Sequence, residues 1–301
     1  MSPDSSSSPA GLYRSAMRAA WVGLAFNLGL AIIKITAGVL GRSFALLSDA
    51  VNSLGDTVAS VLTLLALWYA QQPADEEHPY GHTRAETIAA AYLAILIVLS
   101  ALYVGWEAVH RLSPIHDLPP LWTLWIAGAN VLIKEGLYWY KREVGRRTGS
   151  MAIVANAWDH RSDALGSLAV LIGLSVVRMG GPGYIWADHA AALVVVVMIV
   201  WNGSLLLRQS TSELLDPQAD AETVDKVRQL AAGVSGVRAV EKLWVRKTGL
   251  EYLVDIHIQV DASLTVEAGH RIGHAVKDRL VAGFAEVRDV LVHLEPYPHQ
   301  R

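Results

Sequence analysis

Two pairs of oxygen-bearing side chains, each spaced four residues apart, interrupt otherwise apolar stretches of this sequence. Asp159 and Asp163 form one pair, and Asn52 and Asp56 form the other. Residues four apart on a helix leave the same face one turn from each other. Ionised groups inside a membrane are costly unless they are paired or bound. The two pairs therefore predict a divalent-cation site between two helices, although acids at helix ends that face water would show the same spacing.

Other charged residues in the apolar stretches have a more local interpretation. Lys34, Lys134 and Glu135 each lie in such a stretch, and we interpret them as members of ion pairs within or between helices. Arg161 follows Asp159 by two residues, so it points elsewhere on the helix. We expect Arg161 to neutralise part of the acidic cluster when no cation is bound.

A second group of potential metal ligands lies in a polar segment between two apolar stretches. Asp75, His78 and His82 fall close together in the sequence Asp-Glu-Glu-His-Pro-Tyr-Gly-His. Imidazole and carboxylate at short spacing are typical ligands of first-row transition metals. A solvated acidic loop would have the same composition, so the residues alone leave both interpretations open.

A third group lies near the C-terminus, where His257, His270, His293 and Glu295 could converge. His293 and Glu295 are two residues apart, so on a strand they share a face. Scattered surface histidines would look the same one by one.

The composition indicates a membrane protein followed by a smaller polar domain. Of the 301 residues 52% are hydrophobic, and the mean hydropathy is +0.32, which is high for a soluble domain. The chain has no cysteine, which excludes disulfides and thiolate ligands. A net charge of −3 without a basic stripe gives no sign of nucleic-acid binding. Residues 1–12 are rich in serine and proline, and we expect a disordered tail there.

Six apolar stretches are long enough to span a bilayer, which takes about 20 helical residues. They are Ala16–Leu40, Ser43–Ala70, Glu86–Leu112, Leu121–Arg142, Met151–Met179 and Tyr184–Leu207. Most of the Lys and Arg residues that flank these stretches fall on the side of the two termini, namely Arg14, Arg18, Arg84, Lys141, Arg142, Arg146, Arg147 and Arg208. Fewer fall on the other side, namely Arg42, Arg111 and Arg178. The positive-inside rule therefore predicts that both termini are cytoplasmic.

From Glu213 onward the pattern is that of a small α+β domain. Helices are predicted over 221–232 and 265–282, and strands over 237–247, 251–260 and 287–294. This αββαβ order resembles a ferredoxin-like arrangement. The sequence thus predicts an all-α transmembrane domain of six helices over 13–208 and a cytoplasmic α+β ferredoxin-like domain over 209–301.

Three motifs together resemble the cation diffusion facilitator family, which consists of divalent metal/proton antiporters. They are Ser48–Asp56, His78–His82 followed by Arg84 and Glu86, and Asn156–Asp163. The resemblance covers nearly the whole chain and implies a homodimer in the lipid bilayer that exchanges cytoplasmic metal for protons. It implies a secondary transporter without a catalytic cofactor, and no nucleic-acid partner.

The resemblance also assigns the candidate ligands to three sites. Asn52, Asp56, Asp159 and Asp163 match the transport site, and Asp75, His78 and His82 match a second site between the second and third helices. In the cytoplasmic domain, a regulatory metal site at the dimer interface is implied for Glu241, His257, His270, His293 and Glu295. Glu241 and Glu295 stand where the family more often has His and Asp.

The ligand types indicate which metal is transported. Zinc transporters of the family usually carry histidine in one of the two helix pairs, and this sequence has none there. Oxygen ligands suit harder ions such as Mn²⁺, whereas imidazole suits zinc, cobalt and nickel. The set also resembles the manganese-exporting branch, so we expect Mn²⁺ as the transported ion, with Zn²⁺, Fe²⁺ and Co²⁺ as alternatives.

Two functions of other classes fit less well. A membrane-bound metal-dependent hydrolase would need a nucleophile or general base beside the metal, and the sequence contains neither HExxH nor GxSxG. A non-transporting metal sensor would have lost the acids of the helix pairs, which are retained here.

The compact chain fits a bacterial inner membrane protein.

Overall fold

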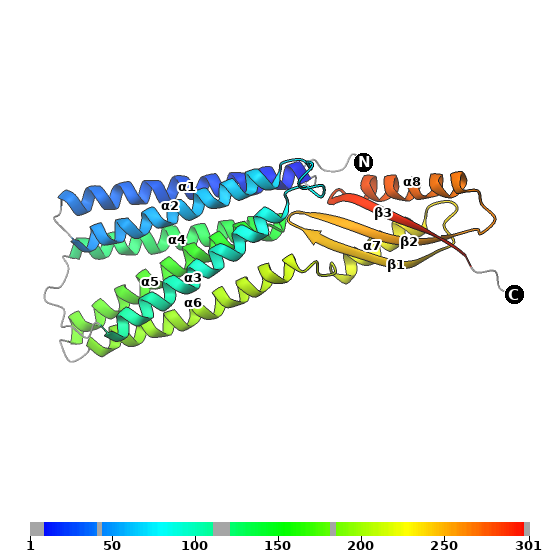
Figure 1. The fold of residues 1–301 in the computed structure, drawn as a ribbon. Helices are drawn as coiled ribbons and strands as arrows, with labels where there is room; N and C mark the ends of the chain where they lie inside the picture. Colours follow the sequence, from blue (N-terminus) through cyan, green and yellow to red (C-terminus); the bar gives the residue numbers. More distant parts are fainter. Residues whose placement is uncertain (1–8, 41–43, 111–120, 181–184, 298–301) are drawn as a thin grey trace. The chain divides into compact units, whose positions relative to one another are not determined.

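The computed structural model describes residues 9–40, 44–110, 121–180 and 185–297. The chain forms two compact units (Figure 1), a helical unit over Ser15–Thr211 and a C-terminal unit over Ser212–Arg301 that also includes Met1–Arg14. Their order along the chain matches the predicted all-α domain followed by a small α+β domain.

Six long helices make up most of the first part of the chain. They are α1 (Pro9–Leu40), α2 (Phe44–Ala70), α3 (Arg84–His110), α4 (Leu121–Thr148), α5 (Met151–Gly180) and α6 (Ile185–Leu214). Each carries one of the six predicted spans. Helix α1 is described from Pro9, so residues 9–12 of the segment predicted to be a disordered tail are helical.

Three helical segments among the described residues are long and apolar enough to cross a membrane by length and composition. They are Ala10–Thr36, Ser53–Ala70 and Arg84–Tyr103. Helices α4 and α5 carry more charge, including Lys134, Lys141, Asp159 and Asp163. These charges lower the hydropathy of the two helices that pack most closely on each other.

Helix α5 lies at the centre of the packing, in contact with α2, α3 and α4 (Figure 1). Its buried side toward the N-terminal end is built from small residues, among them Ala152, Ala155 and Ala157, all fully buried. Small residues let helix backbones approach closely inside a membrane. This approach brings polar side chains of α2 and α4 within reach of the acids on α5.

The C-terminal unit is a three-stranded sheet with two helices. In chain order it contains α7 (Ala221–Ala232), β1 (Ala239–Thr248), β2 (Glu251–Val260), α8 (Val266–Gly283) and β3 (Val287–Pro296). Strands β1 and β2 pair antiparallel, and β2 and β3 pair parallel. A parallel pair needs a crossover connection, which α8 supplies. The predicted αββαβ order is therefore confirmed, with boundaries within two residues.

The two faces of this sheet differ in polarity. Along β2, Val254, Ile256, Ile258 and Val260 are buried in a core that includes Val227 of α7 and that α8 also enters. The residues between them, His257 among them, are less buried and belong to the opposite face, because successive side chains on a strand alternate. Side chains on this open face of the sheet are therefore accessible for binding a ligand.

Candidate metal centres

The first centre lies between α2 and α5, where three carboxylates meet. Asp56 of α2 and Asp159 and Asp163 of α5 each offer an oxygen atom, and these atoms lie within 4.8 Å of one another. Asp56 is only 6% exposed. Within the described part of the chain, Asp159 Oδ2 is buried without a hydrogen-bond partner. A cation bound here would satisfy that oxygen and balance the clustered negative charge. We call this group the carboxylate centre.

The fourth residue predicted for this centre is Asn52, which lies on α2 one turn before Asp56. The side chain of Asn52 falls outside the described residues. Its part in the centre stays a prediction based on the four-residue spacing.

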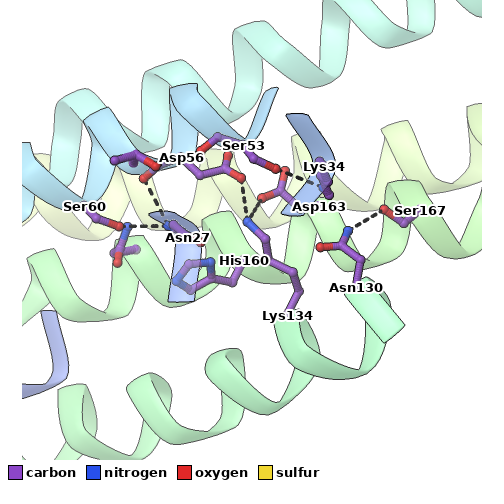
Figure 2. Close-up of polar contacts among 12 residues, drawn as sticks. Asn27, Lys34, Ser53, Asp56, Ser60, Asn130, Lys134, His160, Asp163 and Ser167 are labelled. Atoms are coloured by element: carbon purple, nitrogen blue, oxygen red, sulfur yellow. Dashed lines mark hydrogen bonds and ion pairs between the residues drawn. The ribbon is translucent and has the colours of Figure 1, made fainter. Parts of the chain in front are cut away.

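A lysine from a third helix joins the carboxylate centre (Figure 2). The Lys134 ammonium of α4 donates to Asp56 Oδ2 at 2.6 Å and to Asp163 Oδ2 at 2.8 Å. The ion pair predicted for Lys134 is therefore confirmed, although its partners are two of the predicted metal ligands. Lys34 donates to Ser53 Oγ at 2.9 Å, and Glu135 accepts from Trp139 Nε1 at 2.9 Å.

Arg161 does not take the role expected from the sequence. Its guanidinium donates to the Tyr138 hydroxyl at 2.7 Å and lies 4.4 Å from the centroid of the same ring. The ring of Trp158 is 5.4 Å from it. Because these aromatic faces hold the guanidinium by cation–π attraction, the charge that pairs with the acids is Lys134 and not Arg161.

Two further contacts position the helices that carry the carboxylates. Asn27 of α1 is fully buried and donates to the backbone carbonyl of Asp56 at 3.2 Å and to Ser60 Oγ at 3.0 Å (Figure 2). Glu86 of α3 accepts from Ser150 Oγ at 2.6 Å and from the backbone N–H of Ala152 at 3.0 Å. A carboxylate at a helix N-terminus is favourable, so Glu86 fixes the beginning of α5.

A second buried lysine lies two turns further along α4. The Lys141 ammonium donates to Asn156 Oδ1 and lies 2.9 Å from His160 Nε2, both on α5. His160 therefore points away from the carboxylates, as its place next to Asp159 predicts. Lys141 also packs directly against the backbone of Gly23 on α1, where a Cβ would have no room.

The second centre lies in the segment between α2 and α3. The ligand atoms of Asp75, His78 and His82 are within 4.8 Å of one another. The backbone N–H of His78 donates to Asp75 Oδ1 at 2.6 Å, and this bond lowers the pKa of the Asp75 carboxyl. His82 Nε2 lies 3.3 Å from Asp75 Oδ2, while its Nδ1 is 3.1 Å from the carbonyl of Pro73. The three residues predicted from the loop are thus brought together.

The third centre lies on the open face of the C-terminal sheet, and we call it the imidazole centre. It contains His257, His293 and Glu295, whose ligand atoms are within 4.8 Å of one another. His257 and His293 are register partners on the parallel strands β2 and β3. His257 Nδ1 lies 2.7 Å from Glu295 Oε1. A side-chain hydrogen bond with Glu241 and this one with His257 lower the pKa of Glu295.

The other two residues predicted for this centre lie in different places. Glu241 on β1 is exposed, accepts from Gln259 Nε2 at 3.0 Å and lies beside Glu295. His270 lies on α8, with its ring 4.5 Å from that of His274, and it is not part of the cluster formed by the described residues of one chain. Because α8 crosses from β2 to β3 and packs into the core face, the fold itself separates His270 from the open face.

Comparisons with known proteins assign the two units. The family model for the cation efflux transmembrane domain matches residues 20–215, and that for the cytoplasmic domain of cation efflux proteins matches residues 219–297. The chain therefore belongs to the cation efflux family, the cation diffusion facilitators that its motifs resemble. It is a membrane protein of a family of transporters, and its C-terminal unit is the cytoplasmic domain.

Individual relatives cover most of the chain. It is 30% identical to the manganese efflux system protein MneP of Bacillus subtilis, over 93% of this chain and 96% of that protein. It is 34% identical to metal tolerance protein C1 of Arabidopsis thaliana over 91% of this chain, but spans only 61% of that relative's length. The solved structure MamM-CTD 215-293 is 30% identical over 26% of this chain and 100% of that chain, with a TM-score of 0.25.

Proposed function

We propose that this protein exports Mn²⁺ from the cytoplasm in exchange for protons and that the carboxylate centre is its transport site. The observation that carries the proposal is the cluster of Asp56, Asp159 and Asp163 within 4.8 Å, contributed by two helices of a cation efflux domain. A relative that matches nearly full length is named a manganese efflux system protein, which supports the same ion.

The choice of Mn²⁺ rests on the ligand atoms. The centre offers carboxylate oxygens, to which we add the amide oxygen of Asn52, and the nearest histidine on α5, His160, is engaged with Lys141 instead. Oxygen-rich sites suit hard divalent ions, whereas nitrogen and sulfur ligands favour zinc and the later transition metals. Selectivity would then come from ligand type rather than from raw affinity, because Mn²⁺ stands at the weak end of the divalent series.

The exchange for protons follows from what a carboxylate can hold. An ionised carboxylate binds the metal, and a protonated one releases it, so metal and protons compete for the same oxygens. In the inward-facing state Asp56, Asp159 and Asp163 would take metal from the cytoplasm. In the outward-facing state on the more acidic side, protons would replace it.

The other two centres would regulate or supply this site. We propose that the protein is a homodimer in a bacterial inner membrane with both termini in the cytoplasm. The imidazole centre would bind a regulatory metal, with Glu241 and His270 as further ligands at the dimer interface, and the loop centre of Asp75, His78 and His82 would bind a second one. Truncation after Arg208 should then weaken transport or dimerisation.

The test is metal-driven proton flux in proteoliposomes, with Mn²⁺ and Zn²⁺ compared on the wild type and on Asp159→His. We expect the wild type to move Mn²⁺ faster and the histidine variant to gain Zn²⁺ flux at the expense of Mn²⁺. A wild type that prefers Zn²⁺, Fe²⁺ or Co²⁺ would leave metal efflux in place but overturn the choice of ion. Metal uptake without proton movement would overturn the exchange.

A further inference from the structure

The carboxylate centre already contains a positive charge that belongs to the protein. The Lys134 ammonium bonds to one oxygen of Asp56 and one of Asp163, at 2.6 and 2.8 Å (Figure 2). Its side chain is 1% exposed, so water cannot screen it effectively. The two aspartates come from different helices, and Lys134 bridges them.

A divalent ion bound by the same carboxylates would compete with this ammonium. It would approach the oxygens of Asp56 and Asp163 to about 2.0–2.2 Å, which is closer than the hydrogen bonds of Lys134 at 2.6 and 2.8 Å. A dication and an ammonium held a few ångströms apart in a buried site repel each other strongly. An ion held by both Asp56 and Asp163 would therefore require the Lys134 ammonium to move.

Helix α4 offers a place to which the ammonium can move. Asn130 lies one turn before Lys134 on the same helix face, and its side chain is 3% exposed (Figure 2). Asn130 Nδ2 donates to Ser167 Oγ at 3.3 Å, but within the described residues its Oδ1 accepts no hydrogen bond. A buried acceptor without a donor is unfavourable, so an ammonium that leaves the carboxylates gains a partner at Asn130.

We propose that Lys134 is a tethered counter-cation of the transport site. It occupies the carboxylates between metal loads, is displaced toward Asn130 when a metal ion binds, and so sets how tightly the ion is held. The proposal rests on the proposed function only in that Asp56 and Asp163 bind the transported metal, whichever divalent ion that is. It makes Lys134 a determinant of affinity and not a metal ligand.

A purely structural ion pair would behave in the opposite way. If Lys134 only held α2, α4 and α5 together, its loss would loosen the aspartates and weaken metal binding. If it competes with the metal, its loss leaves the carboxylates free and strengthens binding. The sign of the change in affinity therefore separates the two roles.

The experiment measures binding of Mn²⁺ and Zn²⁺ to the full-length dimer in detergent, for the wild type and for Lys134→Met. Methionine keeps the length of the side chain and removes its charge. The matched control is Lys34→Met, since Lys34 is also buried and donates to the Ser53 hydroxyl. We expect at least about tenfold tighter binding for Lys134→Met and a change of less than about threefold for the control. Equal or weaker binding by Lys134→Met overturns the proposal.

A second measurement uses the wild type alone and stands even if the variant fails to fold. An amine-reactive reagent is applied with and without saturating metal, and modification of each lysine is read by mass spectrometry. Displacement breaks the hydrogen bonds that hold the ammonium to Asp56 and Asp163, so the labelling of Lys134 should rise at least about threefold while that of Lys34 stays unchanged. Unchanged or lower labelling of Lys134 overturns the proposal. Preference for Zn²⁺ in these assays would overturn the Mn²⁺ assignment while leaving the role of Lys134 intact.

Discussion

The carboxylate centre and the imidazole centre both gather potential metal ligands, but they do so in opposite surroundings. In the helical unit, three acids are gathered where Asp56 is 6% exposed, and a lysine is built in beside them. In the C-terminal unit, two imidazoles and one carboxylate lie on an open sheet face, with 62% of the His293 side chain exposed. The first centre is buried and rich in carboxylates, and the second is open and rich in imidazoles.

The difference follows from the cost of burying charge. Carboxylates removed from water need a compensating cation, and Lys134 places a positive charge beside Asp56 and Asp163. The imidazole centre is open to water, which can solvate its side chains, so it needs no built-in cation. We therefore expect the carboxylate centre to exchange one cation for another, and the imidazole centre simply to bind or release its metal.

The largest effect is expected from the loss of a single buried acid in the carboxylate centre. Asp163→Asn removes one of three carboxylates and one partner of Lys134, and we expect metal flux in proteoliposomes to fall at least about 100-fold. The control is Glu135→Gln, the same chemical change on α4, where the carboxylate accepts from the exposed Trp139. A variant Asp163→Asn that keeps more than about a tenth of the flux would show that transport does not pass through this centre.

The corresponding change in the imidazole centre should be milder. His293→Ala removes one ligand from the open face, and we expect the affinity of the cytoplasmic domain for metal to fall about 10- to 100-fold. Flux at saturating metal should fall less than about fivefold, because the transport site is untouched. His274→Ala, on α8, is the control for loss of an exposed histidine. If His293→Ala abolished flux even at saturating metal, the imidazole centre would be part of the transport route.

A third prediction concerns how tightly the helical unit is packed around Lys141, the second buried lysine. A methyl group at Gly23 would collide with the ammonium end of Lys141, so Gly23→Ala should lower the free energy of unfolding by about 2 kcal/mol. Gly29→Ala on the same helix meets no atom within 4 Å and should be neutral or stabilising by up to about 1 kcal/mol. Thermal unfolding in detergent measures both, and equal effects would contradict the tight fit at Gly23.

The smallest expected effect lies at an exposed helix cap of the C-terminal unit. Asp220 accepts from the backbone N–H of Thr223 at 2.9 Å, which lowers the pKa of the carboxyl. Asp220→Ala should cost about 1 kcal/mol at pH 7. Because the folded pKa lies below the unfolded one, this stabilisation is present above the usual carboxyl range and disappears as the pH falls through the lowered pKa. A difference in thermal unfolding that grew as the pH fell from 7 to 3 would contradict this assignment.

How much of each region could be predicted from the sequence depended on whether the information was local. The helix and strand boundaries of the C-terminal unit came out within two residues because hydrophobic alternation and the Thr-Gly turn are local signals. Asp159 and Asp163 share a face because helix geometry alone requires it. His257 and His293 could be suspected, but their meeting needed the parallel register of β2 and β3.

Other features of the sites had no signal in the sequence. The expected role of Arg161 was wrong, because neighbouring aromatic rings from α4 and α5 hold its guanidinium. The position of Glu86 at the beginning of α5 was missed, since its partner Ser150 lies 64 residues away. The family resemblance predicted His270 for the imidazole centre, but the crossover helix α8 places it outside the cluster of described residues.

The sequence by itself determined the class of this protein, its six apolar helices and its αββαβ domain, and the spacing that places acids in pairs. The class follows from the motifs that match a family, and the helices, the strands and the paired acids follow from composition and from the periodicity of helices and strands, which act over a few residues. Only the tertiary structure decided that Lys134, 78 residues from Asp56, is the cation between the two helices. The position of Lys134 depends on how α2, α4 and α5 are rotated and packed. A long lysine side chain can reach many positions, and only the packing of these helices selects one of them.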